Sequence, residues 1–175
     1  MARISLIEPN EHPELAFVLE KIRSGRRGTV INVYKLLLHS PAIAEIWLEL
    51  INAARWKTDL DGRLREIVIV RVGYLNRCSY VINQHVPRLS AAEGLTQEEC
   101  DALADWDESS FFSEGERAAL AFTDASTRDV EVPEGVFNAL RPHFSERQIL
   151  ELTVLVGAYN MHTRMCQALA IDPQT

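Results

Sequence analysis

The segment LREIVIVRVGYL, residues 64–75, decides how the rest of the chain is interpreted. Its centre, Ile67–Val72, is rich in β-branched residues, so by itself it looks more like a buried strand than a helix. The chain contains no second segment of comparable quality to pair with it, and a lone strand would leave its backbone groups without hydrogen-bond partners. We therefore predict a helix that is buried on most sides.

Helix start signals recur along the chain on both sides of this segment. Ser40 can cap a helix that has Pro41 at its first position, where the missing N–H costs nothing. A hydroxyl residue followed three positions later by Glu or Gln, the capping-box pattern, occurs at Thr96, Ser113 and Ser145. The last of these opens a long segment, residues 146–169, with apolar residues at helical spacing. The pattern predicts an all-α fold.

Length and charge limit the class of protein. A chain of 175 residues most simply forms one domain, spanning residues 1–175. The net charge of -7 argues against a general nucleic-acid binder. The only basic cluster comprises Arg23, Arg26 and Arg27. We interpret it as a solvated turn, because its glycines lack the spacing and the preceding strand of a phosphate-binding loop.

The N-terminal residues and the cysteine content indicate the compartment. The first residues turn acidic by Glu8, and no apolar core of signal-peptide length follows them. Nowhere do about 18 apolar residues run together, so we expect no membrane contact and a cytoplasmic protein. Three cysteines, an odd number, without an export signal predict reduced thiols rather than a disulfide framework.

The segment NRCSYVINQH, residues 76–85, brings a cysteine and a histidine into one predicted helix. Because a helix rises about 1.5 Å per residue, Cys78 and His85 lie roughly 10 Å apart along the axis. We expect them to share a face without touching. Cys78 also lies close to the predicted helix start, where backbone N–H groups can lower the pKa of a thiol.

The stretch LREIVIVRVGYLNRCSYVINQHVPRLSAAEGLT, residues 64–96, resembles the core motif of the carboxymuconolactone decarboxylase and alkylhydroperoxidase D (AhpD) superfamily. The resemblance extends to VINVYKLLLHSPAIAEIW upstream and LVGAYNMHTRMCQALAI downstream, so it covers most of the chain. It implies an AhpD-like helical bundle that assembles with copies of itself as a dimer, trimer or hexamer.

The resemblance also implies site residues. Glu66, Cys78 and His85 stand at the positions of the glutamate, the first cysteine and the histidine of the family's peroxidase branch, which implies catalytic roles for them. The second cysteine of the family's C-x-x-C pair is replaced by Val81. An oxidised Cys78 would therefore need an outside thiol, or the distant Cys100 or Cys166, to resolve it.

Glu66 and His85 are a stronger candidate for a catalytic pair than Cys78 alone. A carboxylate next to an imidazole can raise its pKa and orient one ring nitrogen, which leaves the other nitrogen for proton transfer. We expect this pair to raise the pKa of His85 unless desolvation outweighs it. The alternatives are a satisfied histidine at a subunit interface, and an ion pair of Glu66 with Arg63 or Arg71.

The remaining candidate residues give weaker evidence of function. Tyr80 and Asn83 are candidates for substrate binding in the same pocket. The sequence carries no fingerprint of a nucleotide, flavin or haem, so we expect no cofactor. His162 and Cys166 stand four residues apart, but no second pair with ligand spacing accompanies them, and we expect no metal site. The three tryptophans, Trp47, Trp56 and Trp106, are expected to be core or interface anchors.

Three functional hypotheses remain. The first, implied by the decarboxylase branch, is an acid–base enzyme acting on a small organic acid, lactone or related metabolite through His85 and Glu66. The second is a peroxiredoxin-like activity through Cys78. The third is a non-catalytic oligomeric binding protein. The missing C-x-x-C pair weighs against the second hypothesis, and the retained Glu66 and His85 weigh against the third, so the sequence favours the first.

Overall fold

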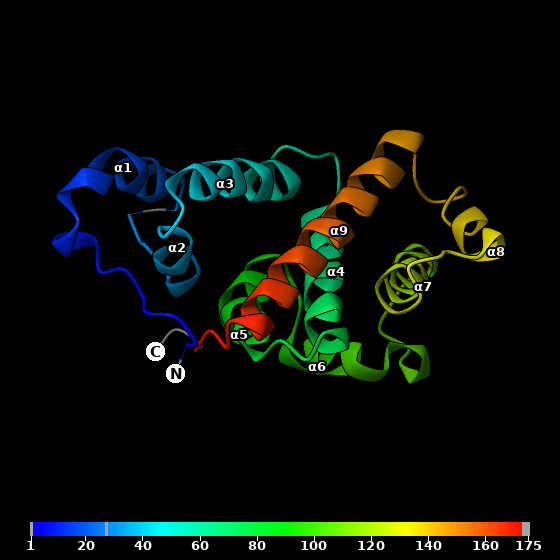
Figure 1. The fold of residues 1–175 in the computed structure, drawn as a ribbon. Helices are drawn as coiled ribbons and strands as arrows, with labels where there is room; N and C mark the ends of the chain where they lie inside the picture. Colours follow the sequence, from blue (N-terminus) through cyan, green and yellow to red (C-terminus); the bar gives the residue numbers. More distant parts are fainter. Residues whose placement is uncertain (1, 27, 173–175) are drawn as a thin grey trace.

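A computed structural model describes residues 2–26 and 28–172, and every regular element within them is helical (Figure 1). The α-helices are α1 (Ala16–Gly25), α2 (Asn32–Leu37), α3 (Pro41–Trp56), α4 (Gly62–Leu75), α5 (Ser79–Gln84), α6 (Gln97–Ala102), α7 (Glu114–Arg128), α8 (Glu134–Asn138) and α9 (Glu146–Ala168). A π-helical segment, η3 (His85–Ser90), continues α5, and 3-10 segments η1 (Pro9–Glu11), η2 (Pro13–Leu15) and η4 (Leu103–Glu108) complete the set. No helix in the described ranges has the length and apolarity needed to cross a membrane.

The helix α4 is the centre of the fold. It is crossed by α9 and lies between α7 on one side and α5 on the other (Figure 1). Every residue from Leu64 to Gly73 is buried, which confirms the prediction of a helix enclosed on most sides. Burying an Ile or Val side chain stabilises the fold by about 1.5–3 kcal/mol, much more than the few tenths that separate helix propensities. Tertiary burial therefore outweighs the β-branched composition of Ile67–Val72.

The three predicted capping boxes are confirmed at the starts of α6, α7 and α9. In each, the side chain of Thr96, Ser113 or Ser145 accepts a hydrogen bond from the backbone N–H three residues later. At α3, Pro41 does occupy the first turn, but the side chain of Ser40 makes no capping hydrogen bond. Ser40 is therefore the N-cap residue of α3, as predicted, but the predicted capping by its side chain is wrong.

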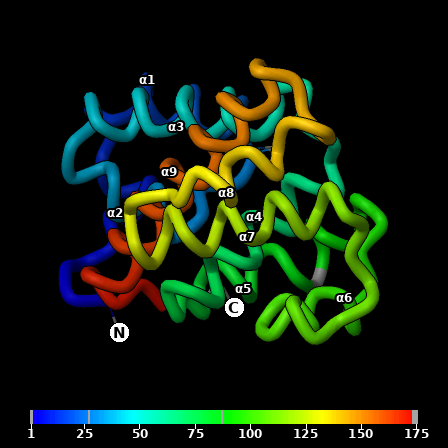
Figure 2. The backbone as a smooth tube through the Cα atoms, turned by 90° about the vertical axis from the view of Figure 1, so that its right-hand side faces the viewer, coloured from blue at the N-terminus to red at the C-terminus, as the bar shows by residue number. Residues whose placement is uncertain are grey.

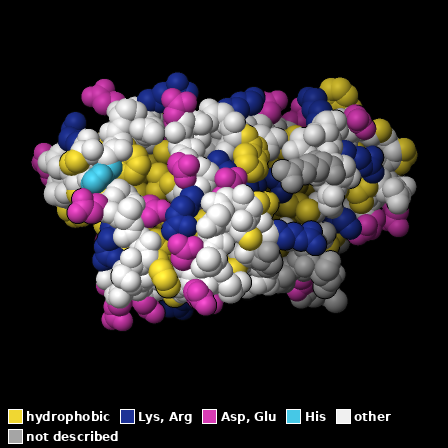
Figure 3. Space-filling model, turned by 180° about the vertical axis from the view of Figure 1, so that it is seen from behind, with side chains coloured by type: hydrophobic (Ala, Val, Ile, Leu, Met, Phe, Trp, Pro, Cys, Tyr) yellow, Lys and Arg dark blue, Asp and Glu magenta, His cyan; other side chains and the backbone are white. Residues whose placement is uncertain are grey.

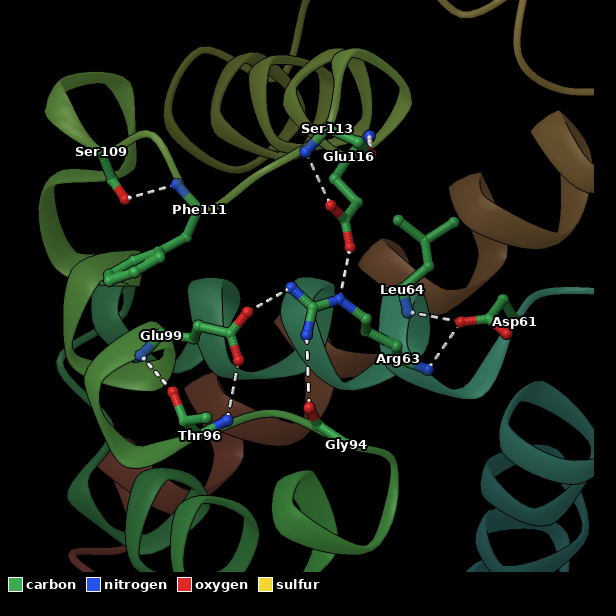
Figure 4. Close-up of polar contacts among 10 residues, drawn as sticks. All are labelled: Asp61, Arg63, Leu64, Gly94, Thr96, Glu99, Ser109, Phe111, Ser113 and Glu116. Atoms are coloured by element: carbon green, nitrogen blue, oxygen red, sulfur yellow. Dashed lines mark hydrogen bonds and ion pairs between the residues drawn. The ribbon is translucent and has the colours of Figure 1, made fainter.

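Two of these boxes are joined to α4 by one arginine (Figure 4). Arg63 donates from Nε to Glu116 at 2.8 Å and from Nη2 to Glu99 at 2.6 Å. The same two carboxylates accept the N-cap N–H groups of Ser113 and Thr96, each at 2.8 Å. Arg63 therefore fixes the starts of α6 and α7 against the start of α4, and its guanidinium is committed there.

A second arginine of α4 holds the following segment. Arg71 donates two hydrogen bonds of 2.6 Å to the carboxylate of Asp124 on α7. Its remaining nitrogen donates to the carbonyl oxygens of Leu103 and Ala104 at 2.8 and 2.6 Å. Because a buried charge is tolerated only when it is paired, this arrangement explains how α4 carries Arg71 in an otherwise apolar run.

Apolar side chains pack in two clusters around α4. The larger joins α4 to α9 and to the layer of α1–α3, and the smaller joins α4 to α6, η4 and α7. Viewed from the side of α7 and α8, these two helices lie in front of α4, while α1 and α3 lie at the top (Figure 2). Trp47 is buried in the larger cluster and Trp106 packs against the smaller, as expected of core anchors.

Some large apolar side chains remain on the surface. On the face seen in Figure 3, hydrophobic side chains lie in small groups between charged ones. Along α3, Ile43, Ile46 and Leu50 are exposed on one face. Along α9, the exposed members are Leu150, Val154 and Met161. The two helices contact each other.

Candidate active site

The structure brings Glu66 and His85 into direct contact. Glu66 lies in the middle of α4, and His85 follows the last residue of α5, where the chain enters η3. The Nδ1 atom of His85 is 2.6 Å from Oε2 of Glu66. Glu66 is 0% and His85 5% exposed, so the pair is closed off from bulk water. Because the two residues come from different helices, their contact depends on the packing of α5 and η3 against α4.

The partners of Glu66 differ from those expected. Its other oxygen, Oε1, accepts a hydrogen bond from Nη2 of Arg55 at 3.1 Å and lies 3.8 Å from Nε of Arg65. Neither Arg63 nor Arg71 pairs with it, because both guanidiniums are paired with residues of α6, α7 and η4. The Glu66 carboxylate therefore has positively charged guanidiniums, those of Arg55 on α3 and Arg65 on α4, near Oε1 and the His85 imidazole near Oε2.

Burial decides the protonation of His85. Desolvation lowers the pKa of His85, and it outweighs the opposing effect of the Glu66 carboxylate. Burial raises the pKa of Glu66, but His85, Arg55 and Arg65 lower it more, so the carboxyl is ionised. The expected rise in the His85 pKa depended on desolvation being the smaller of the two effects; here desolvation is the larger, so the pKa falls. At neutral pH the ring is uncharged, its Nδ1–H donates to Glu66, and Nε2 carries a lone pair.

Tyr159 of α9 faces that lone pair. Its hydroxyl lies 3.5 Å from Nε2 of His85, and the two rings meet edge to face with centroids 5.6 Å apart. Burial raises the pKa of Tyr159 to about 12, so the hydroxyl keeps its proton and acts as a donor. Glu66, His85 and Tyr159 therefore form a chain of polar contacts through the two ring nitrogens of His85. In this chain Nδ1 of His85 carries a proton and Nε2 can accept one.

A small cavity opens beside this chain of contacts. Its walls include His85, Tyr80, Gln84, Tyr159 and His162, and its volume of about 30 Å³ has room for one or two water molecules. Through shared walls at Arg26, Ile31, Arg55 and Leu89 it adjoins an outer hollow of about 340 Å³. The outer hollow is of the size that small organic ligands occupy.

Three buried polar atoms near the cavity have no hydrogen-bond partner among the described residues. They are Nε1 of Trp47, Nε of Arg55 and Nδ1 of His162. Buried polar groups without a partner are rare, so these atoms are available to bind a small polar molecule. Burial lowers the pKa of His162 to about 3, and the ring is therefore neutral. It stacks on Tyr159, with centroids 5.6 Å apart.

The remaining predicted site residues fall in different places. Tyr80 lines the cavity, and its hydroxyl accepts a hydrogen bond from the N–H of Val33 at 3.2 Å. Asn83 is exposed on α5, and Gln84 faces the cavity in its place. Cys78 is completely buried at the start of α5 and does not line the cavity. Among the described residues no group of three His, Cys, Asp or Glu side chains could hold a metal ion.

Sequence reasoning missed several cavity residues. Arg26, interpreted as part of a solvated turn, is half-buried, with its guanidinium 5.7 Å from the ring centre of Tyr34, and it lines both hollows. Arg27 lies outside the described residues. Trp56 is 48% exposed, and its ring lies 4.4 and 4.6 Å from the guanidiniums of Arg55 and Arg65. The one available signal was the arginine next to an aromatic residue in RW, residues 55–56.

Known proteins share this sequence pattern and fold. The pattern of the carboxymuconolactone decarboxylase family matches residues 41–125. The uncharacterized protein YnjA of Escherichia coli strain K12 is 30% identical over 129 residues, covering 73% of this chain and 68% of YnjA.

Solved structures of other proteins have the same fold as this chain. A protein of Agrobacterium tumefaciens, described as a putative antioxidant defence protein AhpD, superposes with a TM-score of 0.75 at 28% identity, over 80% of this chain and 96% of that one. A peroxidase-related protein of Silicibacter sp. TM1040 has the same fold, with a TM-score of 0.83 at 22% identity over 99% of this chain and 92% of the other. The chain belongs to the carboxymuconolactone decarboxylase family, within the superfamily that includes AhpD.

Proposed function

We propose that the protein is a proton-transfer enzyme for a small organic acid or lactone, with His85 as the general base and Glu66 as the residue that orients it. The observation that carries the proposal is the 2.6 Å contact between the buried Glu66 carboxylate and Nδ1 of His85. It directs the Nε2 lone pair toward Tyr159 and the cavity. An imidazole accepts a proton only in its neutral form, and burial keeps His85 in that form.

The chemistry requires no thiol. Nε2 of His85 takes a proton from a carbon next to a substrate carbonyl, and the electron pair moves onto the carbonyl oxygen. The imidazolium that forms is stabilised by the Glu66 carboxylate in contact with Nδ1. The Tyr159 hydroxyl lies near Nε2 and can donate a hydrogen bond to the developing negative charge. His85 then returns its proton to carbon, and the enzyme is restored.

The surroundings favour an anionic substrate. Arg26 lines both the inner cavity and the outer hollow, and no described carboxylate lies within ion-pair distance of it. Nε of Arg55 is buried and unpartnered in the same walls. A carboxylate in the outer hollow would pair with Arg26, leaving the other end of a small molecule directed toward His85.

Hydrogen–deuterium exchange tests the proposal without knowledge of the natural product. In D2O, NMR would follow deuterium uptake next to the carbonyl of γ-lactones and 3-oxo acids that carry a carboxylate. We expect the protein to accelerate exchange, and Arg26→Gln to raise KM for the carboxylates by about tenfold or more, because a charge-assisted pair contributes about 1.5–3 kcal/mol. The methyl esters of the same compounds should be unaffected by the variant.

Arg23→Gln is the matched control, because Arg23 lies one turn earlier on α1 and does not line either hollow. Equal KM values for Arg26→Gln and the unmodified protein would refute the assignment of Arg26. Absence of exchange on every compound would refute the proton-transfer function and favour a non-catalytic binding protein.

A second candidate function is peroxide reduction through Cys78. One observation favours it: hydrogen bonding by the thiol of Cys166 lowers the pKa of Cys78 to about 7. A thiol with a pKa of about 7 is about half thiolate at pH 7, a much larger fraction than for an ordinary thiol with a pKa of about 8.5.

We also propose that the protein assembles with copies of itself. The exposed apolar residues of α3 and α9 lie on two helices in contact, and a surface of this kind is typical of a self-association site. Light scattering at micromolar concentration should give a mass that is a multiple of 19.8 kDa. Ile46→Asp should shift the population toward monomer, since Ile46 is 68% exposed and its loss leaves the core intact. A uniform monomer before mutation would rule out the assembly.

A further inference from the structure

We propose that Cys78 and Cys166 form a redox site in which hydrogen peroxide oxidises Cys78 and Cys166 then closes a reversible disulfide between α5 and α9. The inference extends the second candidate function and is independent of proton transfer at His85. It names as the partner thiol a residue of the last helix, 88 positions away in the sequence. Disulfide formation is a stoichiometric event, so it can be tested apart from catalytic peroxide reduction.

Hydrogen bonds join the backbone segment just before Cys78 to the part of α9 that contains Cys166. Gln167, next to Cys166, donates from Nε2 to the carbonyl oxygens of Arg77 at 2.6 Å and Asn76 at 3.3 Å. Asn76 in turn donates from Nδ2 to Oγ1 of Thr163 on α9 at 2.9 Å. The segment that leads into Cys78 is therefore fastened to the turn of α9 that carries Cys166.

The chain also turns sharply at this point. Arg77 has φ of 53°, in the left-handed region that a residue with a Cβ adopts only at a cost. This turn ends α4 and places Cys78 at the first position before α5. Cys78 and Cys166 are 0% and 1% exposed and belong to the same apolar cluster, so their sulfur atoms are held in place by packing on every side.

The two thiols have different roles. Hydrogen bonding from the Cys166 thiol and from the N–H groups of Val81 and Tyr80 lowers the pKa of Cys78 to about 7 against the effect of burial. The same hydrogen bond, with burial, raises the pKa of Cys166. Cys78 is therefore the nucleophile, and Cys166 keeps its proton until it is needed.

Neither of the other candidates can serve as the partner. Val81, at the position of the second cysteine in the family motif, has no sulfur. Cys100 lies on α6 in the smaller apolar cluster, with Ile67, Val70 and Leu103, and burial raises its pKa. Because Cys100 is buried, reduced and placed away from Cys78, it is a matched internal control.

The reaction balances with one peroxide and two thiols. The Cys78 thiolate attacks one oxygen of hydrogen peroxide, the O–O bond breaks, and the hydroxide that leaves takes up a proton to give water. The product is a sulfenic acid on Cys78. The Cys166 sulfur attacks the Cys78 sulfur, an S–S bond forms, and the sulfenic oxygen leaves as a second water. A small external dithiol reverses the oxidation by thiol–disulfide exchange.

The burial of the two cysteines limits the size of the oxidant. Tyr80 and Val81 follow Cys78 by two and three residues, His162 precedes Cys166 by four, and all three line the inner cavity. Neither cysteine lines that cavity, and both are almost completely buried, so an oxidant has to pass between packed side chains to reach them. Hydrogen peroxide, which is close to water in size, passes more readily than a hydroperoxide on a bulky organic group. The site should therefore react with hydrogen peroxide in preference to cumene hydroperoxide.

Peptide mapping of the unmodified protein is the primary test. After treatment with one equivalent of hydrogen peroxide and alkylation of the remaining thiols, mass spectrometry without reductant should find one linked peptide pair, containing Cys78 and Cys166. Cys100 should be alkylated, and dithiothreitol should restore both free thiols. Oxidation should be at least about tenfold faster with hydrogen peroxide than with cumene hydroperoxide, and its rate should rise with pH through about 7.

Three variants separate the roles. Cys166→Ser should stop at a sulfenic acid on Cys78, trapped by dimedone, and then overoxidise, whereas Cys78→Ser should lose rapid oxidation altogether. Cys100→Ser should form the disulfide as the unmodified protein does. The proposal is refuted if the unmodified protein yields only overoxidised Cys78, links Cys78 to Cys100, or leaves all three thiols free. A disulfide without catalytic peroxide turnover would keep this inference and remove the peroxidase function.

Discussion

Replacing His85 with glutamine is expected to slow proton exchange on the lactone and oxo acids by about 10²–10⁴-fold, the usual contribution of a general base. Glutamine is polar and close in size, so it can remain in contact with Glu66 but has no basic nitrogen. Glu66→Gln should slow exchange to a smaller extent, because His85 keeps its base and loses only the charge that stabilises the imidazolium. NMR titration should then show a lower His85 pKa than in the unmodified protein.

The control for these variants is His143→Gln, since His143 is exposed in the loop between α8 and α9 and lies outside both hollows. Circular dichroism should show that each variant keeps its helical content. If His85→Gln exchanged protons as fast as the unmodified protein, His85 would not be the base, and the proposed mechanism would be abandoned.

The free energy of unfolding should fall steeply as the pH drops below about 6.5. Burial lowers the folded-state pKa of both His85 and His162 below the unfolded value of about 6.5. Below that pH the unfolded chain takes up protons that the folded protein does not, so stability is fully present above about 6.5 and is lost on acidification. For His162, with a folded pKa of about 3, the loss by about pH 4.5 amounts to about 2–3 kcal/mol.

Urea unfolding at about pH 7 and about pH 4.5, at one protein concentration, measures this loss. His162→Phe should reduce it by roughly one proton's contribution, because phenylalanine keeps the stacking on Tyr159 and removes a ring nitrogen that has no described partner. His143→Gln should leave the pH dependence unchanged, since His143 is exposed. An identical pH dependence in His162→Phe would show that His162 is not buried in its neutral form.

The sequence by itself determined the helical class and pointed to Glu66 and His85 as the main pair of the candidate site. Capping boxes at Thr96, Ser113 and Ser145 are local signals, because the side chain and the N–H that it binds lie three residues apart. The helical state of Ile67–Val72 followed from the absence of a partner strand and not from local propensity. Glu66 and His85 were identified by their family positions, since each lies within one continuous motif.

Only the tertiary structure decided what surrounds that pair. Arg55 of α3 and Tyr159 of α9 reach Glu66 and His85 because α3, α4, α9 and the end of α5 pack at one point, and no local pattern encodes such a crossing. The direction of the His85 pKa also depended on packing, since desolvation and the Glu66 charge oppose each other and burial determines which is larger. For the same reason, the sequence could not distinguish between Cys100 and Cys166 as the partner thiol of Cys78. The packing of α5 against α9 favours Cys166.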